Sequence, residues 1–305
     1  MIIRNFLFHR VSDEKDLLWP PMKPELFDKI IRKLTSEFEV VNLENFVCEK
    51  QNSPGGKKPV ATILFDDGYK DNIEYAAPIL KKYNCPASFY VVTECIDKNI
   101  PTWTYLLDHT LQKTEKSVIE LDYDFVPEGF KKIMTGESMS AATRKLKPWM
   151  KSLSNVKRLQ IMQAILEQGA MSAPQQQMMT WKEVKELADN GFAIGSHTNT
   201  HPMLAQLENI REIEEELKIS QNKILQQVGQ APVTISYPIG SYNKKVMALS
   251  ESVGYKIGLA VEQRFYNTNT DDLFSIPRVE LYQEPWYKVA ARISGLYNTI
   301  KRLWK

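Results

Sequence analysis

Residues 60–68 read VATILFDDG, a run of mainly apolar residues that ends in two adjacent aspartates and a glycine. An unbroken run of this kind predicts a strand that is buried on both faces, as in a parallel sheet. Asp66 and Asp67 follow at the carboxyl end of this strand, the edge where parallel barrels carry their catalytic residues. Asp-Gly is also a common turn pair, so an ordinary turn remains an alternative for these residues.

Outward from this strand, short apolar runs alternate with amphipathic helical patterns along the chain. This alternation predicts a parallel sheet, and roughly eight strand–helix units suit a deformed (β/α)7–8 barrel. A doubly wound open sheet is the alternative, although no glycine-rich nucleotide motif follows the early strands. The predicted strands are 3–8, 38–41, 60–65, 87–93, 192–195, 233–237, 256–260 and 275–279, and the main helices are 25–34, 72–83, 180–190 and 209–225.

One segment, from about residue 100 to about 177, interrupts the alternation. It has no clear strand after 118–121 but contains helical patterns at 142–151 and 156–168. We therefore predict a single catalytic domain over residues 1–305 with a mainly helical insertion at about 100–177. Insertions on barrel loops commonly shape the substrate cleft, and a lid with only a packing role is the alternative.

The composition limits the class of protein. Hydrophobic residues make up 43% and charged residues 25%, so the chain resembles an ordinary globular protein. The net charge is +2, so no global field argues for nucleic acid or anionic substrates. Cys48, Cys85 and Cys95 are odd in number and lack zinc-finger spacing, which predicts reduced thiols. With no signal-peptide pattern and no apolar stretch of membrane-spanning length, the expected location is cytoplasmic.

The C-terminal stretch RISGLYNTIKRLWK is basic and aromatic. It suits peripheral contact with a membrane surface. The other interpretation is a terminal helix that packs Ile293, Leu296, Ile300 and Leu303 onto the body.

A second polar motif, residues 196–201 (SHTNTH), follows the predicted strand 192–195. Two of the four histidines of the chain, His197 and His201, lie here four residues apart, a spacing that can place both imidazoles on one metal ion. Paired histidines are often surface residues, but these follow a strand in a chain that also has a strand-end Asp-Asp pair. One aspartate and two histidines leave positions open for water and substrate, as in catalytic sites.

A third motif, residues 236–240 (SYPIG), also follows a strand. Proline and glycine here indicate a tight turn, which can direct a peptide N–H at a developing oxyanion. Alone, the motif indicates only an ordinary loop.

In this order and spacing, the three motifs resemble the polysaccharide deacetylase family, also known as the NodB homology domain or carbohydrate esterase family four. TILFDDGYKDN, IGSHTNTHPML and ISYPIGSY resemble the family's first three motifs, and the resemblance extends over about residues 59–258. It implies a deformed (β/α) barrel, one zinc-type ion and removal of N-acetyl groups from amino sugars. Co²⁺, Ni²⁺ and Mn²⁺ are alternatives to Zn²⁺, because an Asp-His-His site accepts several first-row metals.

The resemblance also implies roles for individual residues. Asp66 matches the general base, while Asp67, His197 and His201 match the metal ligands. The backbone N–H of Ile239 matches the group that helps to bind the oxyanion.

The sequence departs from the family pattern at two positions. Ser236 stands where the third motif usually has an arginine, and no histidine follows His201 to serve as the late general acid. Some family members are circularly permuted, with the last motif at the N-terminus, and His9 at the end of strand 3–8 is similar to it. We therefore predict His9 as general acid and Arg278 as the missing arginine; a structural histidine and a rim salt bridge are the respective alternatives.

The predicted substrate is an acetylated carbohydrate, in contact with Tyr237, Pro238, Trp103 and Trp181. Aromatic rings can stack on sugars, although each of these residues is also compatible with a place in the core. His109 is interpreted as a helix residue without a catalytic role. The alternatives for the whole chain are a deformylase or amidase acting on a lipid-linked amino sugar, and a non-catalytic glycan-binding barrel, which the missing arginine at Ser236 would favour.

Overall fold

The computed structural model describes residues 1–48, 58–139, 141–170, 174 and 176–296. A curled, mostly parallel sheet forms the body, with the strand order β10-β1-β3-β4-β7-β8-β9, while β2 pairs with β3 and β11 with β1. Among the described strands of this sheet, only β10 runs antiparallel to its neighbour. The strands are β1 (Ile2–Phe8), β2 (Glu39–Val40), β3 (Val60–Phe65), β4 (Ser88–Val91), β7 (Ala193–Ser196), β8 (Thr234–Ser236), β9 (Ile257–Leu259), β10 (Tyr266–Asn267) and β11 (Val279–Glu280).

The segment 276–280 connects the two sides of the curled sheet. Ile276 forms a parallel bridge with Leu259 of β9, and β11 then pairs with Phe6 and Leu7 of β1. The first strand of the chain therefore lies next to the last parallel segment, which gives the predicted barrel-like architecture.

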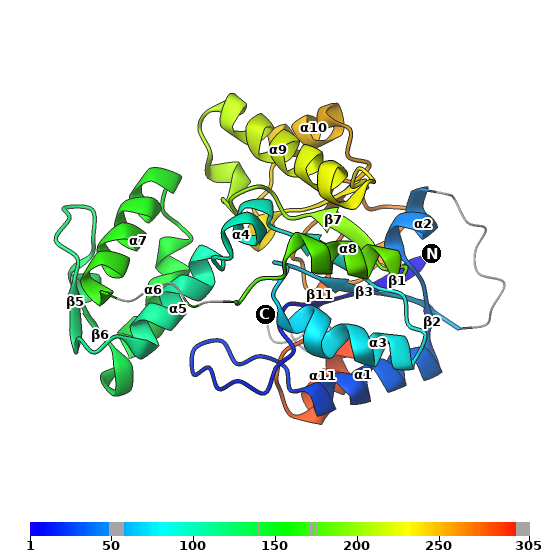
Figure 1. Ribbon diagram of the computed structural model, residues 1–305, viewed down its shortest axis with the longest axis horizontal. Coiled ribbons are helices and arrows are strands. Elements are labelled where there is room, and N and C mark those ends of the chain that lie inside the picture. The colour runs from blue at the N-terminus through cyan, green and yellow to red at the C-terminus, as the bar shows by residue number, and fades with distance from the viewer. Residues whose placement is uncertain (49–57, 140, 171–173, 175, 297–305) are drawn as a thin grey trace.

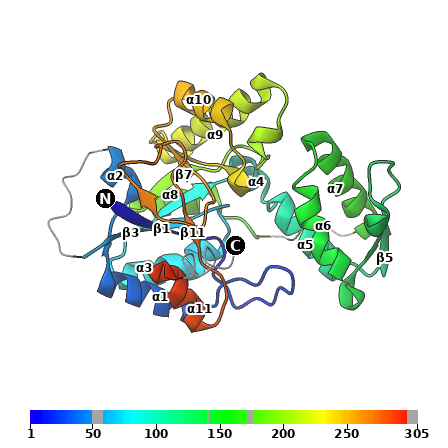
Figure 2. The same ribbon diagram turned by 180° about the vertical axis from the view of Figure 1, so that it is seen from behind.

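Helices cover the sheet from both sides (Figures 1 and 2). On one side lie α1 (Pro24–Glu37), α3 (Ala77–Lys82) and α11 (Trp286–Ser294), and on the other lie α9 (Ile210–Val228) and α10 (Lys244–Val253). The remaining helices of the body are α2 (Leu43–Cys48), η1 (Asn72–Ala76), α4 (Thr93–Lys98), α8 (Trp181–Asp189), η4 (Leu204–Gln206) and η5 (Pro238–Gly240).

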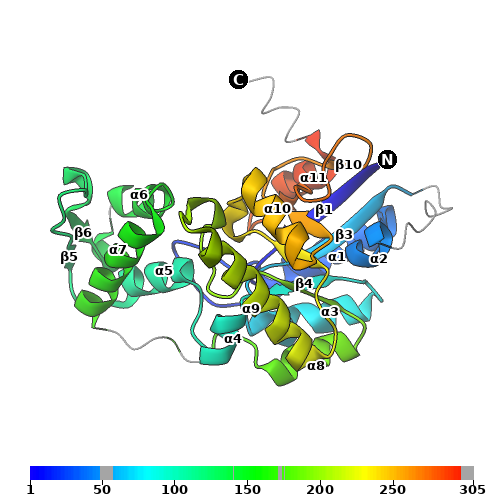
Figure 3. The ribbon, with the colours of Figure 1, turned by 90° about the horizontal axis from the view of Figure 1, so that it is seen from above.

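Residues 103–169 project from this body along the long axis of the molecule (Figures 1 and 3). They form α5 (Trp103–Lys113), β5 (Val118–Glu120), η2 (Glu128–Phe130), β6 (Lys132–Met134), η3 (Gly136–Ser138), α6 (Ala141–Met150) and α7 (Asn155–Gly169). Their apolar residues make a core cluster of their own, which includes Leu107, Leu111, Ile119, Leu146 and Ile161. The insertion is mainly helical, as expected, but it also contains the β5–β6 hairpin, of which only the first strand was predicted from the sequence.

Two local predictions can be compared directly with the structure. The capping box of α8 is present, since Thr180 and Glu183 exchange hydrogen bonds. The predicted helix 72–83 is instead a π-helix (η1) followed by α3. Such π segments are frequent near functional sites, and this one begins five residues after Asp67.

The C-terminal prediction is only partly correct. Ile293 is buried in the body as expected, but Leu296 is 55% exposed. Ile300 and Leu303 lie outside the described residues.

Cys85 and Cys95 are free thiols. In the part of the chain that the structure describes, no helix combines the length and apolarity needed to cross a membrane.

Candidate active site

Three side chains from the ends of β3 and β7 meet at one point. His197 Nε2 and His201 Nε2 each lie 3.4 Å from Asp67 Oδ1, and the potential ligand atoms of the three residues all lie within 4.8 Å of one another. Ligand atoms about 2.1 Å from a tetrahedral ion are separated by about 3.4 Å. The spacing therefore fits three ligands of a single cation.

The backbone around this cluster adopts conformations that L-residues rarely use. Asp67, Thr198, His201 and Ile239 have φ angles of 75°, 68°, 62° and 59°. Each such residue costs about 1–3 kcal/mol, and they concentrate at functional sites. The surrounding contacts must therefore hold these residues in place.

The loop with the two histidines is held by α4 and α9. The N–H groups of Thr93 and Glu94 donate to the carbonyls of Thr198 (3.2 Å) and Asn199 (2.9 Å). From α9, the carboxylate of Glu216 accepts from the N–H groups of Asn199 and Thr200 at 2.9 and 2.8 Å. This carboxylate was not predicted from the sequence, because a glutamate within a charged helix carries no signal of its own.

His197 is oriented by the next strand. Its Nδ1 lies 2.8 Å from the carbonyl oxygen of Ser236 at the end of β8. A hydrogen bond at Nδ1 fixes the ring so that Nε2 faces the cluster, an arrangement common among metal-binding histidines.

Asp66 points to the same centre but is held differently. Arg278 Nη1 donates to Asp66 Oδ1 at 2.8 Å, and Ser236 Oγ lies 3.1 Å from both carboxylate oxygens. Arg278 also donates to Ser236 Oγ (2.9 Å) and to the carbonyl of Ala260 (3.0 Å). The predicted Arg278–Asp66 contact is thus present, and the guanidinium holds the carboxylate without lining the cavity into which Asp66 faces.

The electrostatics of the two aspartates follow from these contacts. Burial by itself would raise the pKa of Asp66, but Arg278 and His197 keep this pKa below its ordinary value. Burial likewise opposes ionisation of Asp67, while His197 and His201 hold its pKa well below the usual range. Both carboxylates are therefore ionised at neutral pH.

Asp67 Oδ1 is buried and, among the described residues, has no hydrogen-bond partner; the Nε2 atoms of His197 and His201 lie 3.4 Å from it. A buried charged oxygen without a partner is costly, and a metal ion is one means of compensating it. Together with two imidazole nitrogens at ligand spacing, this orphaned oxygen fits a divalent cation.

His9 reaches the same site from the end of β1. Its Nδ1 lies 3.3 Å from Glu280 Oε1 of β11, and Tyr282 Oη donates to Glu280 Oε2 at 2.6 Å. Asn72 Nδ2 of η1 donates to the His9 carbonyl at 2.7 Å. Glu280 and Tyr282 were not identified from the sequence; only their place just after the last predicted strand could have indicated them.

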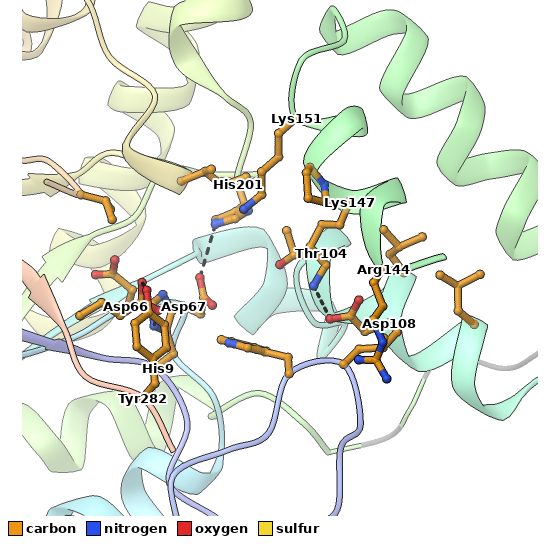
Figure 4. A pocket seen from close by; sticks show the side chains of 18 of the residues that line it. His9, Asp66, Asp67, Thr104, Asp108, Arg144, Lys147, Lys151, His201 and Tyr282 are labelled. Carbon is orange, nitrogen blue, oxygen red and sulfur yellow. Dashed lines mark hydrogen bonds and ion pairs between the residues drawn. The ribbon is translucent and has the colours of Figure 1, made fainter. Parts of the chain in front are cut away.

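These groups share a cavity of about 420 Å³ between the barrel and the insertion (Figure 4). Asp66, Asp67, His9, His197, His201 and Ile239 line the barrel side. The insertion contributes the opposite wall, mainly from α5 and α6, with Thr104, Asp108, Arg144, Lys147 and Lys151. The insertion therefore helps to form the site, as its sequence position suggested.

The four predicted substrate contacts do not line this cavity. Tyr237 is fully buried and stacks on Tyr242 in the core beneath α10, because alternate residues of β8 face opposite sides. Pro238, the next residue, is also buried. Trp181 begins α8 and donates from Nε1 to Asp97 at 2.7 Å.

Trp103 lies at the base of the insertion, with the Arg158 guanidinium 5.3 Å from its ring centre. His109 stacks on Tyr105 within α5 and is not part of the cavity wall. These aromatic residues therefore lie outside the wall of the cavity that contains the Asp-His-His cluster.

Comparison with known proteins agrees with this geometry. The family model described as polysaccharide deacetylase matches residues 53–258. The chain is 22% identical over 259 residues to Bacillus subtilis YxkH, which is named as a putative polysaccharide deacetylase; the alignment covers 84% of this chain and 63% of that protein. This chain belongs to the polysaccharide deacetylase family.

Solved structures share the fold. The Streptococcus pyogenes deacetylase PplD in complex with acetate has a TM-score of 0.63 at 19% identity, over 96% of this chain and 98% of that one. A de-N-acetylase from Aggregatibacter actinomycetemcomitans has a TM-score of 0.64 at 17% identity, over 96% and 100%. These matches agree with the predicted deacetylase-type barrel.

Proposed function

We propose that this protein is a metal-dependent hydrolase that removes the N-acetyl group from an acetylated amino sugar. The observation that carries the proposal is the cluster of Asp67, His197 and His201 at ligand spacing, beside a second, separately held carboxylate, Asp66. Membership of a family that is metal-dependent in general supports it.

Asp67 Oδ1, His197 Nε2 and His201 Nε2 would hold the ion, for which Zn²⁺ is the first candidate and Co²⁺, Ni²⁺ and Mn²⁺ are alternatives. When bound, such an ion supplies Lewis acidity toward the acetamide carbonyl and makes water a better nucleophile at neutral pH. The hydrogen bond from His197 to the Ser236 carbonyl keeps Nε2 in the ligating orientation.

Asp66 serves as general base in this proposal. Its contacts with Arg278 and Ser236 occupy one side of the carboxylate and keep it ionised, ready to accept a proton from the attacking water. Arg278 positions the base without lining the cavity. Arg278 takes the role of the arginine that the third motif usually has at the position of Ser236. The absence of that arginine was the point in favour of a non-catalytic glycan-binding barrel, so this alternative is weakened.

The remaining steps fall to Ile239 and His9. Ile239 lines the cavity in a left-handed turn, and its N–H would help to stabilise the oxyanion of the tetrahedral intermediate. His9 would donate a proton to the leaving amine as acetate departs, with Glu280 and Tyr282 holding its ring.

The test combines metal analysis with mass-spectrometric detection of acetyl loss from a panel of acetylated sugars. Asp66→Asn should keep the metal and lose about 10²–10⁴-fold in turnover, the usual contribution of a general base. His201→Ala should lose both metal and turnover, and removal of the metal by a chelator should abolish activity until it is restored.

The exposed Asp122→Asn serves as the matched control and should behave as wild type. Full activity of Asp66→Asn would contradict the assignment of the base. Failure of the wild-type protein to bind any divalent ion would contradict the proposal as a whole.

A further inference from the structure

The cavity wall carries charges of both signs: the carboxylates are those of Asp66, Asp67, Asp108 and Glu280, and the cations those of Arg144, Lys147 and Lys151. Lys147 forms an ion pair with Asp108, and His9 lies against Glu280. Within the described residues, Lys151 has no ion pair and no hydrogen bond from its ammonium group to a protein acceptor, although it lines the same cavity. Arg144 Nη1 donates to the carbonyl of Leu17 at 3.5 Å.

These cations follow one face of α6, with Lys151 directly after its last residue. Arg144, Lys147 and Lys151 are separated by three and four residues, the spacing that aligns side chains along a helix. Lys147 is directed to Asp108, whereas Lys151 extends toward the His201 side of the cavity (Figure 4). Lys145 is exposed and is not part of the cavity wall.

Gln206 fixes Lys151 relative to the histidine loop. It lies in η4, five residues after His201, and its Nε2 donates to the Lys151 carbonyl at 2.7 Å. Its Oε1 accepts from Arg158 Nη1 at 3.2 Å. This amide therefore attaches the end of α6 to the barrel beside the proposed metal ligands.

Lys151 is partly buried, and its ammonium lines the cavity without a direct carboxylate contact among the described residues. Burial lowers its pKa and Lys147 contributes in the same direction, whereas the charges of Glu280 and Asp108 act against this shift. An ammonium removed from water without a carboxylate partner costs free energy, and a bound anion would offset that cost.

We propose that Lys151, supported by Lys147, binds an anionic group of the substrate, so that the accepted sugar carries a phosphate or carboxylate near its acetamide. The inference rests on the proposed function for the identity of the ligand as an acetylated sugar. Both groups present charged oxygens to a lysine, which acts as a compact point charge with rotatable donors. A cavity of about 420 Å³ has a volume suited to a small ligand.

The test measures binding to the full chain carrying Asp66→Asn, so that turnover does not interfere. Calorimetric titrations compare N-acetylglucosamine with N-acetylglucosamine 1-phosphate and N-acetylmuramic acid, which add a phosphate and a carboxylate respectively. At least one anionic sugar should bind about tenfold or more tightly than the neutral sugar, as expected for a charge-assisted hydrogen bond. Inorganic phosphate alone serves as a competitor that separates recognition of the anion from recognition of the sugar.

Adding Lys151→Gln should remove this preference while leaving binding of the neutral sugar unchanged, and Lys151→Arg should retain much of it. Lys145→Gln, on the same helix but outside the cavity, is the matched control. The preference should also weaken with added salt.

Equal affinity for the neutral and both anionic sugars would overturn the inference, as would an anionic preference that survives Lys151→Gln. Because the readout is binding, the two proposals can fail separately. An anionic preference that depends on Lys151, with no acetate released by the wild-type protein from any of the three sugars, would contradict the proposed activity alone.

Discussion

Replacement of Arg278 by methionine tests how the base is held. Arg278 and Asp66 are 0% and 2% exposed, with Nη1 2.8 Å from Oδ1. Removing one partner of a buried ion pair costs about 3–5 kcal/mol, because the other charge stays buried without compensation. Arg278→Met should therefore lower the free energy of unfolding by about this amount.

A double-mutant cycle separates the pair from general packing. In an Asp66→Asn background no carboxylate remains to be stranded, so Arg278→Met should cost about 2 kcal/mol less than in the wild type, within the range of coupling between contacting residues. Urea unfolding followed by circular dichroism measures the four free energies, with chelator present because a bound ion would stabilise the folded state.

The result that would refute this reasoning is additivity of the two substitutions within about 0.5 kcal/mol. It would mean that Arg278 contributes through packing and not through its charge. A second readout is metal content, which should be unchanged in Arg278→Met because the guanidinium does not contact Asp67 or either imidazole.

Two further predictions concern the scaffold. Burial by itself would raise the pKa of Glu183, but hydrogen bonds from Lys70 and the Thr180 backbone lower it below its ordinary value. The stabilising effect of this carboxylate is therefore present above the ordinary glutamate pKa of about 4.3 and is lost as pH falls through its folded pKa. Glu183→Gln should cost about 1 kcal/mol at pH 7 and little near pH 3 in urea unfolding; a cost independent of pH would show that the charge has no role. A Cβ at Gly195 would lie 2.2 Å from the Tyr90 ring, so Gly195→Ala should destabilise the protein by about 1–3 kcal/mol, and an unchanged unfolding midpoint would contradict this.

Much of the fold was predictable from local patterns. Residues 60–65 form a strand with the predicted bounds, because an unbroken apolar run between polar segments can satisfy burial on both faces only in the sheet interior. Thr180 and Glu183 form the expected capping box. The bounds were less accurate where strands are short, as at 275–279, where strand pairing is limited to Val279–Glu280 and a single bridge at Ile276.

The proposed base and metal ligands were identified from the sequence because strand ends in a parallel sheet meet at one edge. Asp66, Asp67 and His197 each follow a strand closely, so their convergence could be inferred from the order of elements alone. His9 was included through a resemblance, and β1 does lie between β3 and β11, which brings it to the same edge.

Only the tertiary structure decided which way side chains face and which charges are paired. Tyr237 and Trp181 are residue types that often contact sugars. In the structure, Tyr237 follows β8 and packs into the core, whereas Trp181 begins α8 and donates to Asp97. Conversely, Glu280 and Lys151 carry no motif, and their places beside His9 and within the cavity depend on contacts between segments far apart in the chain. Sequence determines periodicity and the order of strand ends, whereas burial and charge pairing depend on distances that exist only after the chain has folded.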